Sequence, residues 1–350
     1  MDIQFKPLSQ IDLSDSFFNT LKQDYAEFEK WFQRKQQDNS KAFIMESDTG
    51  LEAFLYLKLE DGPVENIEPN LPTSKRLKIG TFKVNPHGTR LGERFIKKIF
   101  DYCIRYKLKE AYVTIFPKHV YLLRLLKRYG FDQVGTKDSH NGQEIVLLKK
   151  FTEFADDILK DYPLFNINGV NKYQLAIFPE YHTRLFPDSI LNNEHFDIIQ
   201  DVSHTNSIHK IYICSMPIGI LQPKDLLVIY RTGDKQAAAY YRAVVTSVCV
   251  VEEVRRGSSF EDVAQFLAYC QTYSVFSEEE LSQWYEKGNV FVIKLTYNAA
   301  FSRRVNRKAL IEEIGLNPDV RWGFIKLTDQ EFNHILNRGE INESLIVNKT

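Results

Sequence analysis

Cysteine is scarce in this chain and long apolar runs are missing. The four cysteines, Cys103, Cys214, Cys249 and Cys270, form no CxxC pair and no His/Cys cluster, which argues for reduced thiols and against a zinc site. No apolar run approaches the roughly 18 residues of a membrane-spanning helix, and the start MDIQFKPLSQ lacks the pattern of a secretory signal. The sequence therefore predicts a cytoplasmic protein with no metal and no membrane partner.

Repeats and low-complexity tracts are also missing, so the chain should fold into compact domains. Its 350 residues, 43% hydrophobic and 26% charged, suit a folded protein with two cores rather than one. We expect a first domain over residues 1–151 and a second over residues 172–350. The stretch between them, residues 152–171, mixes a short helix with loop signals and is expected to be a linker.

A strong charge of one sign is missing overall but present locally. The formal net charge is -1. Residues 1–150 hold 25 basic and 20 acidic side chains, whereas residues 151–350 hold 20 and 26. Within residues 75–128 there are 15 basic and 3 acidic side chains. Such a concentration indicates an anionic ligand or surface, although the solvated faces of two helices explain part of it.

The first half alternates strand-like and helix-like runs, which predicts a mixed α/β domain. Apolar residues recur at helical spacing over residues 15–35, 90–107 and 119–130. Short apolar runs predict the strands IQFKPL, KAFIMES, LEAFLYLKLE, RLKIGTFKV, EAYVTIF, FDQVGTK and EIVLLKKF. Residues 61–75, rich in proline and acid, are expected to be a loop.

Residues 84–95, VNPHGTRLGERF, connect a strand to a helix through two glycines and a proline. Glycine lets the backbone approach a ligand closely, and the amides at a helix start favour anions. This arrangement is suited to a phosphate, although a glycine turn before a helix is more often only a connection.

Together with AYVTIF and HVYLLRLLKRYGF, this stretch makes residues 41–151 resemble the GCN5-related N-acetyltransferase (GNAT) family. The resemblance implies a fold that binds acetyl-CoA. Its pyrophosphate would lie on the loop and helix start, and its thioester beside the strand before them. The implied cofactor-binding residues are Phe82, Val84, His87, Gly88, Thr89, Arg90, Leu91, Gly92, Glu93 and Arg94. The family pattern, Gln or Arg, two residues, Gly, one residue, Gly or Ala, reads His87, Arg90 and Gly92 here, so only the last glycine matches.

The catalytic residues depart further from the family. Many members carry a tyrosine four residues before the glycine of Gly-Phe, as the acid for the leaving thiolate; this chain has Leu126 there. Tyr129 lies on a neighbouring helix face and is the candidate acid, with packing as the alternative. His119 is the second candidate, with a helix cap or a surface position as the alternative. The strand KIGTFKV carries no carboxylate base, so proximity and backbone amides would supply most of the catalysis.

The second half is rich in apolar strands, among them DLLVIYR and YYRAVVTSVCVVEEV, with helices expected near residues 259–270, 277–287 and 307–314. The runs PKDLLVIYR, NVFVIKLTY and RWGFIKL resemble the PUA-like superfamily, which includes ASCH and EVE domains. The resemblance implies a β-barrel that binds RNA or a modified nucleotide. The matching residue types are Tyr230, Arg231, Arg242, Trp322 and Lys326, since a base needs an aromatic platform and its phosphate needs cations. The alternative for the aromatic residues is a place in the core.

The fold class expected is therefore α+β, a GNAT-type mixed α/β domain followed by a PUA-like β-barrel. The function expected is acetyl-CoA-dependent N-acetylation, with RNA or aminoacyl-tRNA as the candidate acceptor. A CoA-binding or nucleic-acid-binding protein without turnover is the second hypothesis. A small-amine acetyltransferase whose second half supports oligomerisation is the third.

Overall fold

The computed structural model describes residues 3–85, 90–186, 207–233 and 239–347. The described chain divides into two compact units, residues 3–161 and residues 162–347. The segment expected to be a linker carries the short helix α5 (Ile158–Asp161) and the strand β8 (Phe165–Asn166). The exact boundaries of the two domains stay a prediction.

The first unit is built on a seven-stranded mixed sheet with the order β1-β2-β3-β4-β5-β7-β6. Adjacent strands of this sheet run antiparallel, except for the central pair β4 and β5, which is parallel. The strands are β1 (Gln4–Pro7), β2 (Lys41–Ser47), β3 (Gly50–Val64), β4 (Leu71–Val84), β5 (Glu110–Ile115), β6 (Asp132–Ser139) and β7 (Gly142–Lys150). All seven strands predicted from the sequence are confirmed.

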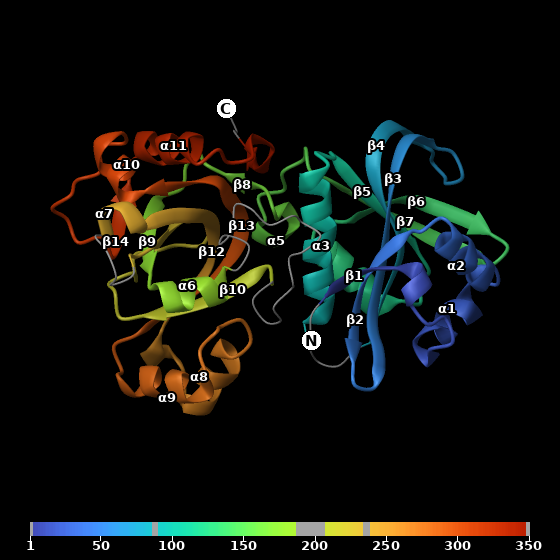
Figure 1. The fold of residues 1–350 in the computed structure, drawn as a ribbon, viewed down its shortest axis with the longest axis horizontal. Coiled ribbons are helices and arrows are strands. Elements are labelled where there is room, and N and C mark those ends of the chain that lie inside the picture. Colours follow the sequence, from blue (N-terminus) through green and yellow to red (C-terminus); the bar gives the residue numbers. More distant parts are fainter. Residues whose placement is uncertain (1–2, 86–89, 187–206, 234–238, 348–350) are drawn as a thin grey trace. The chain divides into compact units, whose positions relative to one another are not determined.

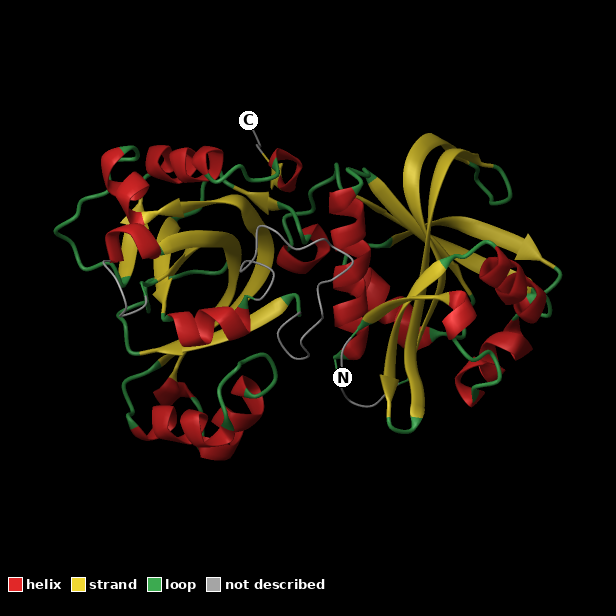
Figure 2. Ribbon diagram, viewed as in Figure 1, coloured by secondary structure: helices red, strands yellow, loops and turns green. Residues whose placement is uncertain are grey.

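Helices cover both faces of this sheet, as Figures 1 and 2 show. The helices α1 (Asn19–Asp24) and α2 (Phe28–Gln37) lie on one face. There Leu21 of α1 and Phe32 of α2 pack in a buried cluster with Phe18 and Phe54. The long helix α3 (Leu91–Arg105) lies on the other face beside α4 (Val120–Arg128). This division follows from the alternation of apolar side chains along the strands.

The expectation of a loop over residues 61–75 was wrong for most of that stretch. Strand β3 continues to Val64 and β4 begins at Leu71, with Gly62 paired to Ser74 and Val64 to Leu71. The long hairpin extends past the acidic and proline-containing residues because pairing with the neighbouring strand decides the backbone conformation there. Local propensity is the weaker influence.

The second unit contains a six-stranded mixed sheet with the order β10-β13-β12-β11-β9-β14. Its two longest strands bend strongly in Figure 1, and their pairing is interrupted by three register shifts of the kind that bend a sheet. The strands are β9 (Lys172–Ile177), β10 (His209–Cys214), β11 (Leu226–Arg231), β12 (Val244–Arg256), β13 (Phe291–Asn306) and β14 (Phe324–Leu327); β15 (Ile346–Val347) pairs with β8. The α+β fold class is confirmed, while closure of this sheet into a barrel stays a prediction.

The helices of the second unit are α6 (Pro179–Leu185), α7 (Ala239–Arg242), α8 (Val263–Cys270), α9 (Glu278–Glu286), α10 (Arg307–Glu312) and α11 (Asp329–Arg338). The helices expected near residues 259, 277 and 307 are α8, α9 and α10. The expectation of a strand beginning at Tyr240 was wrong, because residues 239–242 form α7. This short helix packs against α10, and the Tyr240 hydroxyl donates a hydrogen bond to Glu312. That tertiary contact outweighs the β propensity of the two tyrosines.

Candidate functional site

The central sheet of the first unit opens between its two parallel strands. The β4–β5 ladder consists of three residue pairs and ends at Ile79 and Val113. Beyond that point β4 continues to Val84 with β3 as its partner, and β5 continues to Ile115 with β7. The edge of residues 80–84 that faces away from β3 is therefore turned toward open space rather than toward another strand.

A cavity of about 750 Å3 fills this opening. It is lined by all five residues of the open stretch of β4, by Gly92 and Leu125 from one face of the sheet, and by Tyr25 and Trp31 from the other. Residues from both faces line one cavity, so the cavity passes through the sheet at the opening. A Cβ at residue 92 would lie 2.7 Å from Leu125 Cδ2, which explains why α3 and α4 approach each other at a glycine.

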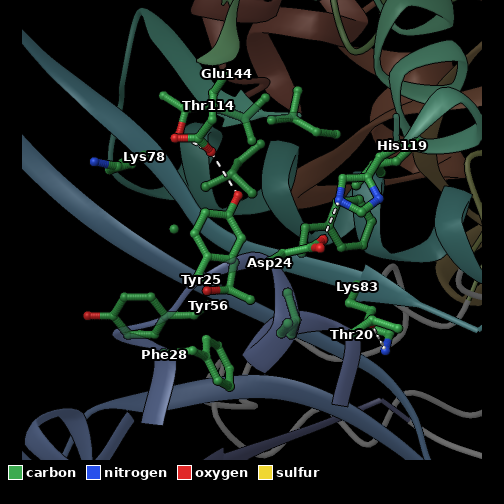
Figure 3. A pocket seen from close by; sticks show the side chains of 18 of the residues that line it. Thr20, Asp24, Tyr25, Phe28, Tyr56, Lys78, Lys83, Thr114, His119 and Glu144 are labelled. Atoms are coloured by element: carbon green, nitrogen blue, oxygen red, sulfur yellow. Dashed lines mark hydrogen bonds and ion pairs between the residues drawn. The ribbon is translucent and has the colours of Figure 1, made fainter. Parts of the chain in front are cut away.

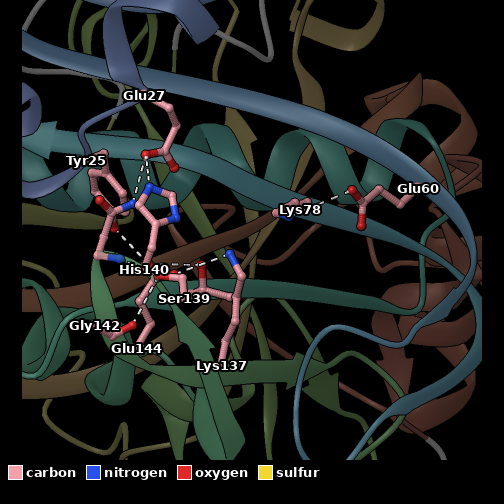
Figure 4. A network of polar contacts seen from close by, with 11 residues as sticks. Tyr25, Glu27, Glu60, Lys78, Lys137, Ser139, His140, Gly142 and Glu144 are labelled. Atoms are coloured by element: carbon pink, nitrogen blue, oxygen red, sulfur yellow. Dashed lines mark hydrogen bonds and ion pairs between the residues drawn. The ribbon is translucent and has the colours of Figure 1, made fainter.

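A buried carboxylate, Glu144 on β7, lies in this cavity (Figures 3 and 4). It is only 2% exposed. Its Oε1 accepts hydrogen bonds from the Tyr25 hydroxyl at 2.7 Å and the Thr114 hydroxyl at 3.2 Å. Its Oε2 lies 3.4 Å from Lys137 Nζ. Three donors thus hold one carboxylate in place beside the opening, as a proton acceptor requires.

Tyr25 keeps its proton in this arrangement. Burial, followed by the neighbouring charge of Glu144, raises the pKa of Tyr25 well above its usual range. The phenol is therefore a hydrogen-bond donor to Glu144 and a second group through which a proton can reach that carboxylate.

His119, a catalytic candidate from the sequence, also lines the cavity. It is the residue directly before α4, but its side chain makes no capping hydrogen bond to the first turn of that helix. Its Nε2 instead lies 3.0 Å from Asp24 Oδ2, and Lys118 binds the other oxygen of the same carboxylate (Figure 3). The cap alternative was therefore wrong, and a catalytic role for His119 stays a prediction.

Tyr129, the other catalytic candidate, lies elsewhere. Its side chain has no exposed surface and packs edge-on against Phe100, with the ring centroids 6.3 Å apart. The Arg128 guanidinium lies over its ring. Tyr129 is not among the residues that line the cavity, so its surroundings favour the packing alternative.

The predicted cofactor-binding residues divide into three groups. Phe82, Val84 and Gly92 line the cavity. His87, Gly88 and Thr89 lie outside the described residues. Arg90 directly precedes α3, and Leu91 is buried in the first turn.

Glu93 and Arg94 have partners inside the unit. Glu93 is buried and forms an ion pair with Arg128 at 3.0 Å, and the Arg94 guanidinium contacts the Met45 sulfur at 3.8 Å. Neither side chain lines the cavity. Their contribution to a phosphate site would therefore come from backbone amides at the helix start.

In the second unit, two of the predicted nucleic-acid-binding residues lie together. Tyr230 and Trp322 are buried with ring centroids 5.5 Å apart, and the Arg307 guanidinium lies 4.4 Å from the Trp322 ring centroid. Within the described part of the chain, Trp322 Nε1, Arg307 Nε and Gln174 Oε1 are buried without a hydrogen-bond partner. Buried polar atoms of this kind call for a bound water or a ligand.

The remaining three predicted residues are more exposed. Arg231 is half-buried at the end of β11, Lys326 is exposed on β14, and Arg242 is exposed on α7 rather than on a strand. The structure therefore does not gather all five residues around the Trp322 ring.

Sequence reasoning missed Glu144, Tyr25 and Arg307. A signal for Glu144 was present: it shares a strand face with Val146 and Leu148, and a carboxylate on a buried face needs an explanation. Tyr25 carried no such signal, because an aromatic residue at helical spacing indicates packing.

No protein-family model matches the sequence, and no curated protein sequence matches it. Solved structures with a similar course of the chain include members of the two groups that the sequence resembles. ASCH from Zymomonas mobilis is 14% identical and covers 47% of this chain and 94% of its own, with a TM-score of 0.34.

The other group consists of N-acetyltransferases. PseH from Campylobacter jejuni, solved with acetyl coenzyme A, is 16% identical and covers 42% of this chain and 98% of its own, at a TM-score of 0.28. Naa50 from Arabidopsis thaliana is 14% identical over 43% of this chain and 100% of its own, at a TM-score of 0.29. At such TM-scores the likeness supports no statement about activity.

The described residues contain no group of three or more His, Cys, Asp or Glu side chains that could hold a metal ion. Among the same residues, none of the helices combines the length and the apolar character that a membrane crossing requires.

Proposed function

We propose that this chain is an acetyl-CoA-dependent N-acetyltransferase whose reaction takes place in the opening between β4 and β5. The observation that carries the proposal is the buried Glu144 carboxylate in a cavity that passes through the sheet. A cavity lined from both faces of the sheet would let two substrates meet from opposite faces. A carboxylate held by three donors at the meeting point can take up a proton.

Acetyl-CoA would supply an acetyl thioester, whose carbonyl carbon bonds to the amine nitrogen while the bond to sulfur breaks. The open edge of β4 suits the cofactor's amide-containing chain, because strand edges bind amide groups through their backbone N–H and C=O. Glu144 would take the proton that the amine loses, directly or through the Tyr25 hydroxyl 2.7 Å away. Backbone amides of Phe82 to Val84 would polarise the carbonyl.

The cofactor's phosphates would lie at the start of α3, on backbone amides from the segment 88–93 and on the Arg90 side chain. The residues described here, Arg90 and the first turn of α3, suit this role because the turn carries the positive end of a helix of 15 residues. His87, Gly88 and Thr89 belong to the same proposal.

The second unit would select the acceptor, and RNA or aminoacyl-tRNA is the candidate. The contact of Tyr230, Trp322 and Arg307 supports a nucleotide site, since an arginine and two rings can hold a base and its phosphate. The unpartnered Trp322 Nε1, within the described chain, supports a polar ligand there. Arg231, Arg242 and Lys326 would contribute charge at longer range.

A protein that binds CoA without turnover is the second candidate. Two observations support it. Leu126 stands at the position of the family's tyrosine, and both Leu126 and the candidate acid Tyr129 are fully buried. Turnover of the thioester separates the two candidates.

The first experiment is a calorimetric titration of the full chain with acetyl-CoA, beside the Arg90→Glu variant. Micromolar binding that the variant loses supports the cofactor site, whereas no binding in either protein rules the proposal out. Replacing Trp322 or Arg231 with Ala should weaken nucleotide binding. If the second unit unfolds instead, these residues belong to its core.

A further inference from the structure

The cavity of the first unit carries an excess of positive charge. Seven basic and three acidic side chains line the whole cavity. Two of the acidic side chains already have a cation beside them: Asp24 binds Lys118, and Glu144 lies 3.4 Å from Lys137. Seven cations against three carboxylates leave the cavity as a whole, including the end where Lys137 shares Glu144 with other donors, with an excess of positive charge.

Two of these lysines face each other directly. The register of β3 and β4 places Lys58 opposite Lys78, and like charges in that position are unfavourable. Both reach toward one oxygen of Glu60, at 2.8 Å from Lys58 and 4.0 Å from Lys78. The other oxygen of Glu60 accepts a hydrogen bond from Tyr112 at 2.5 Å (Figure 4 shows Glu60 and Lys78). One carboxylate thus serves two lysines and a phenol.

Lys78 has the least favourable surroundings of this group. Burial lowers its pKa, and the charges of Lys137 and Lys58 lower it further against the opposing effect of Glu60 and Glu144. Lys78 and Lys137 come from β4 and β6, and Lys137 is the direct cross-strand neighbour of Glu144. A negative group between these two lysines would relieve their repulsion and would lie beside the carboxylate that takes up the proton.

We propose that the amine acetylated by this chain belongs to an anionic molecule, whose phosphate or carboxylate binds between Lys78 and Lys137 while its amine meets Glu144. The inference rests on the acetyl transfer proposed above and specifies its acceptor. It disfavours a cationic acceptor, because Glu60 on β3 is already occupied by Lys58, Lys78 and Tyr112. The cavity is also lined by four aromatic rings, which would contact an apolar part of the acceptor: Tyr25, Phe28, Trp31 and Tyr56.

Two pairs of amines test this inference with the full chain. O-phosphoethanolamine against ethanolamine tests the phosphate, and alanine against alaninamide tests the carboxylate. Binding is measured by ligand-detected NMR, and acetylation by release of the CoA thiol. We expect the anionic member of at least one pair to bind about tenfold more tightly, since charge-assisted contacts with two lysines favour it.

Substitution then assigns that preference to the two lysines. The double variant Lys78→Met, Lys137→Met should reduce the preference to about twofold or less, while Lys78→Arg should retain it. Lys150→Met is the matched control, because Lys150 is an exposed lysine of the same unit paired with Glu153 at 2.7 Å and does not line the cavity. Thermal unfolding of each variant shows whether the unit is intact.

Equal binding of both members in both pairs overturns the inference, and so does a preference for the neutral amines. A preference that survives the double variant also overturns it, because the anion then binds elsewhere. Failure of the acetyltransferase proposal is recognised separately. In that case acetyl-CoA neither binds nor turns over, whereas the NMR comparison of the amines still gives its answer.

Discussion

The large sheet of each unit contains one pair of parallel strands among its described residues, and the two pairs behave differently. In the second unit β9 and β11 remain paired over six residues, Lys172–Ile177 against Leu226–Arg231. In the first unit β4 and β5 pair over three residues, although β4 is 14 residues long. The continuous pair forms a closed part of the core, and the interrupted pair opens a cavity.

The comparison shows what an opening does to the groups around it. Around the continuous pair, Leu175 and Ile229 are fully buried in one apolar cluster. Around the interrupted pair, the polar side chains of Tyr25, Thr114 and Glu144 meet across the sheet. Where two strands separate, their backbone N–H and C=O groups lose their partners across the ladder. Other groups must then form those hydrogen bonds, and a substrate can supply them.

The largest effect expected is on catalysis in the opening. Glu144→Gln keeps the size of the side chain and removes its charge, so kcat should fall by about 10²- to 10³-fold, the usual loss when a general base is removed. The free energy of unfolding should fall as well, because Lys137 loses its charged partner in a buried place, so kcat is compared where each variant is shown to be folded. The matched control is Glu153→Gln, an exposed carboxylate paired with Lys150. Unchanged kcat at saturating amine would show that another group takes the proton.

The next largest effect is expected on stability, when an isoleucine is replaced by alanine in each of the two parallel pairs. Ile229→Ala, in the closed pair, should lower the free energy of unfolding by about 2–5 kcal/mol, because it leaves a void in a packed core. Ile79→Ala, in the last pair before the opening, should cost less. Ile79 already lines the cavity, so the substitution enlarges existing space instead of creating an enclosed void.

Denaturant unfolding of both variants, with the transitions of the two units followed separately, measures this difference. An equal cost would show that the opening does not relax the packing around Ile79, and the contrast between the two strand pairs would then be one of pairing alone.

The smallest effect is expected where α3 meets α4. Gly92→Ala places a methyl group 2.7 Å from the end of the Leu125 side chain, which can move aside. We expect the free energy of unfolding to fall by about 1 kcal/mol or less. The free energy of acetyl-CoA binding should weaken by more than this, because both residues line the cavity. Calorimetry and thermal unfolding measure the two quantities. A loss of stability without a change in affinity would remove Gly92 from the proposed cofactor site.

The sequence determined the strands and helices of both units to a large extent. The seven strands of the first sheet follow from short apolar runs, and α3 and α4 follow from apolar positions at helical spacing, because these patterns reflect the side that each element buries. The glycine-containing sequence before α3 also predicted a ligand site at that end of the sheet. Local pattern was misleading at residues 61–75 and at Tyr240, where strand pairing and the contact with α10 decided the conformation.

The catalytic group could not be found in this way. Glu144 becomes a candidate base only when β7 brings it beside Tyr25, which is 119 positions away in the sequence, and when β4 and β5 separate above it. Arg307 likewise reaches Trp322 only through the folded second unit. The apolar faces of the helices and strands can be read from the sequence alone, since burial is encoded residue by residue. The place where the sheet opens and the charges that meet there follow from the folded chain, because they depend on contacts between distant segments.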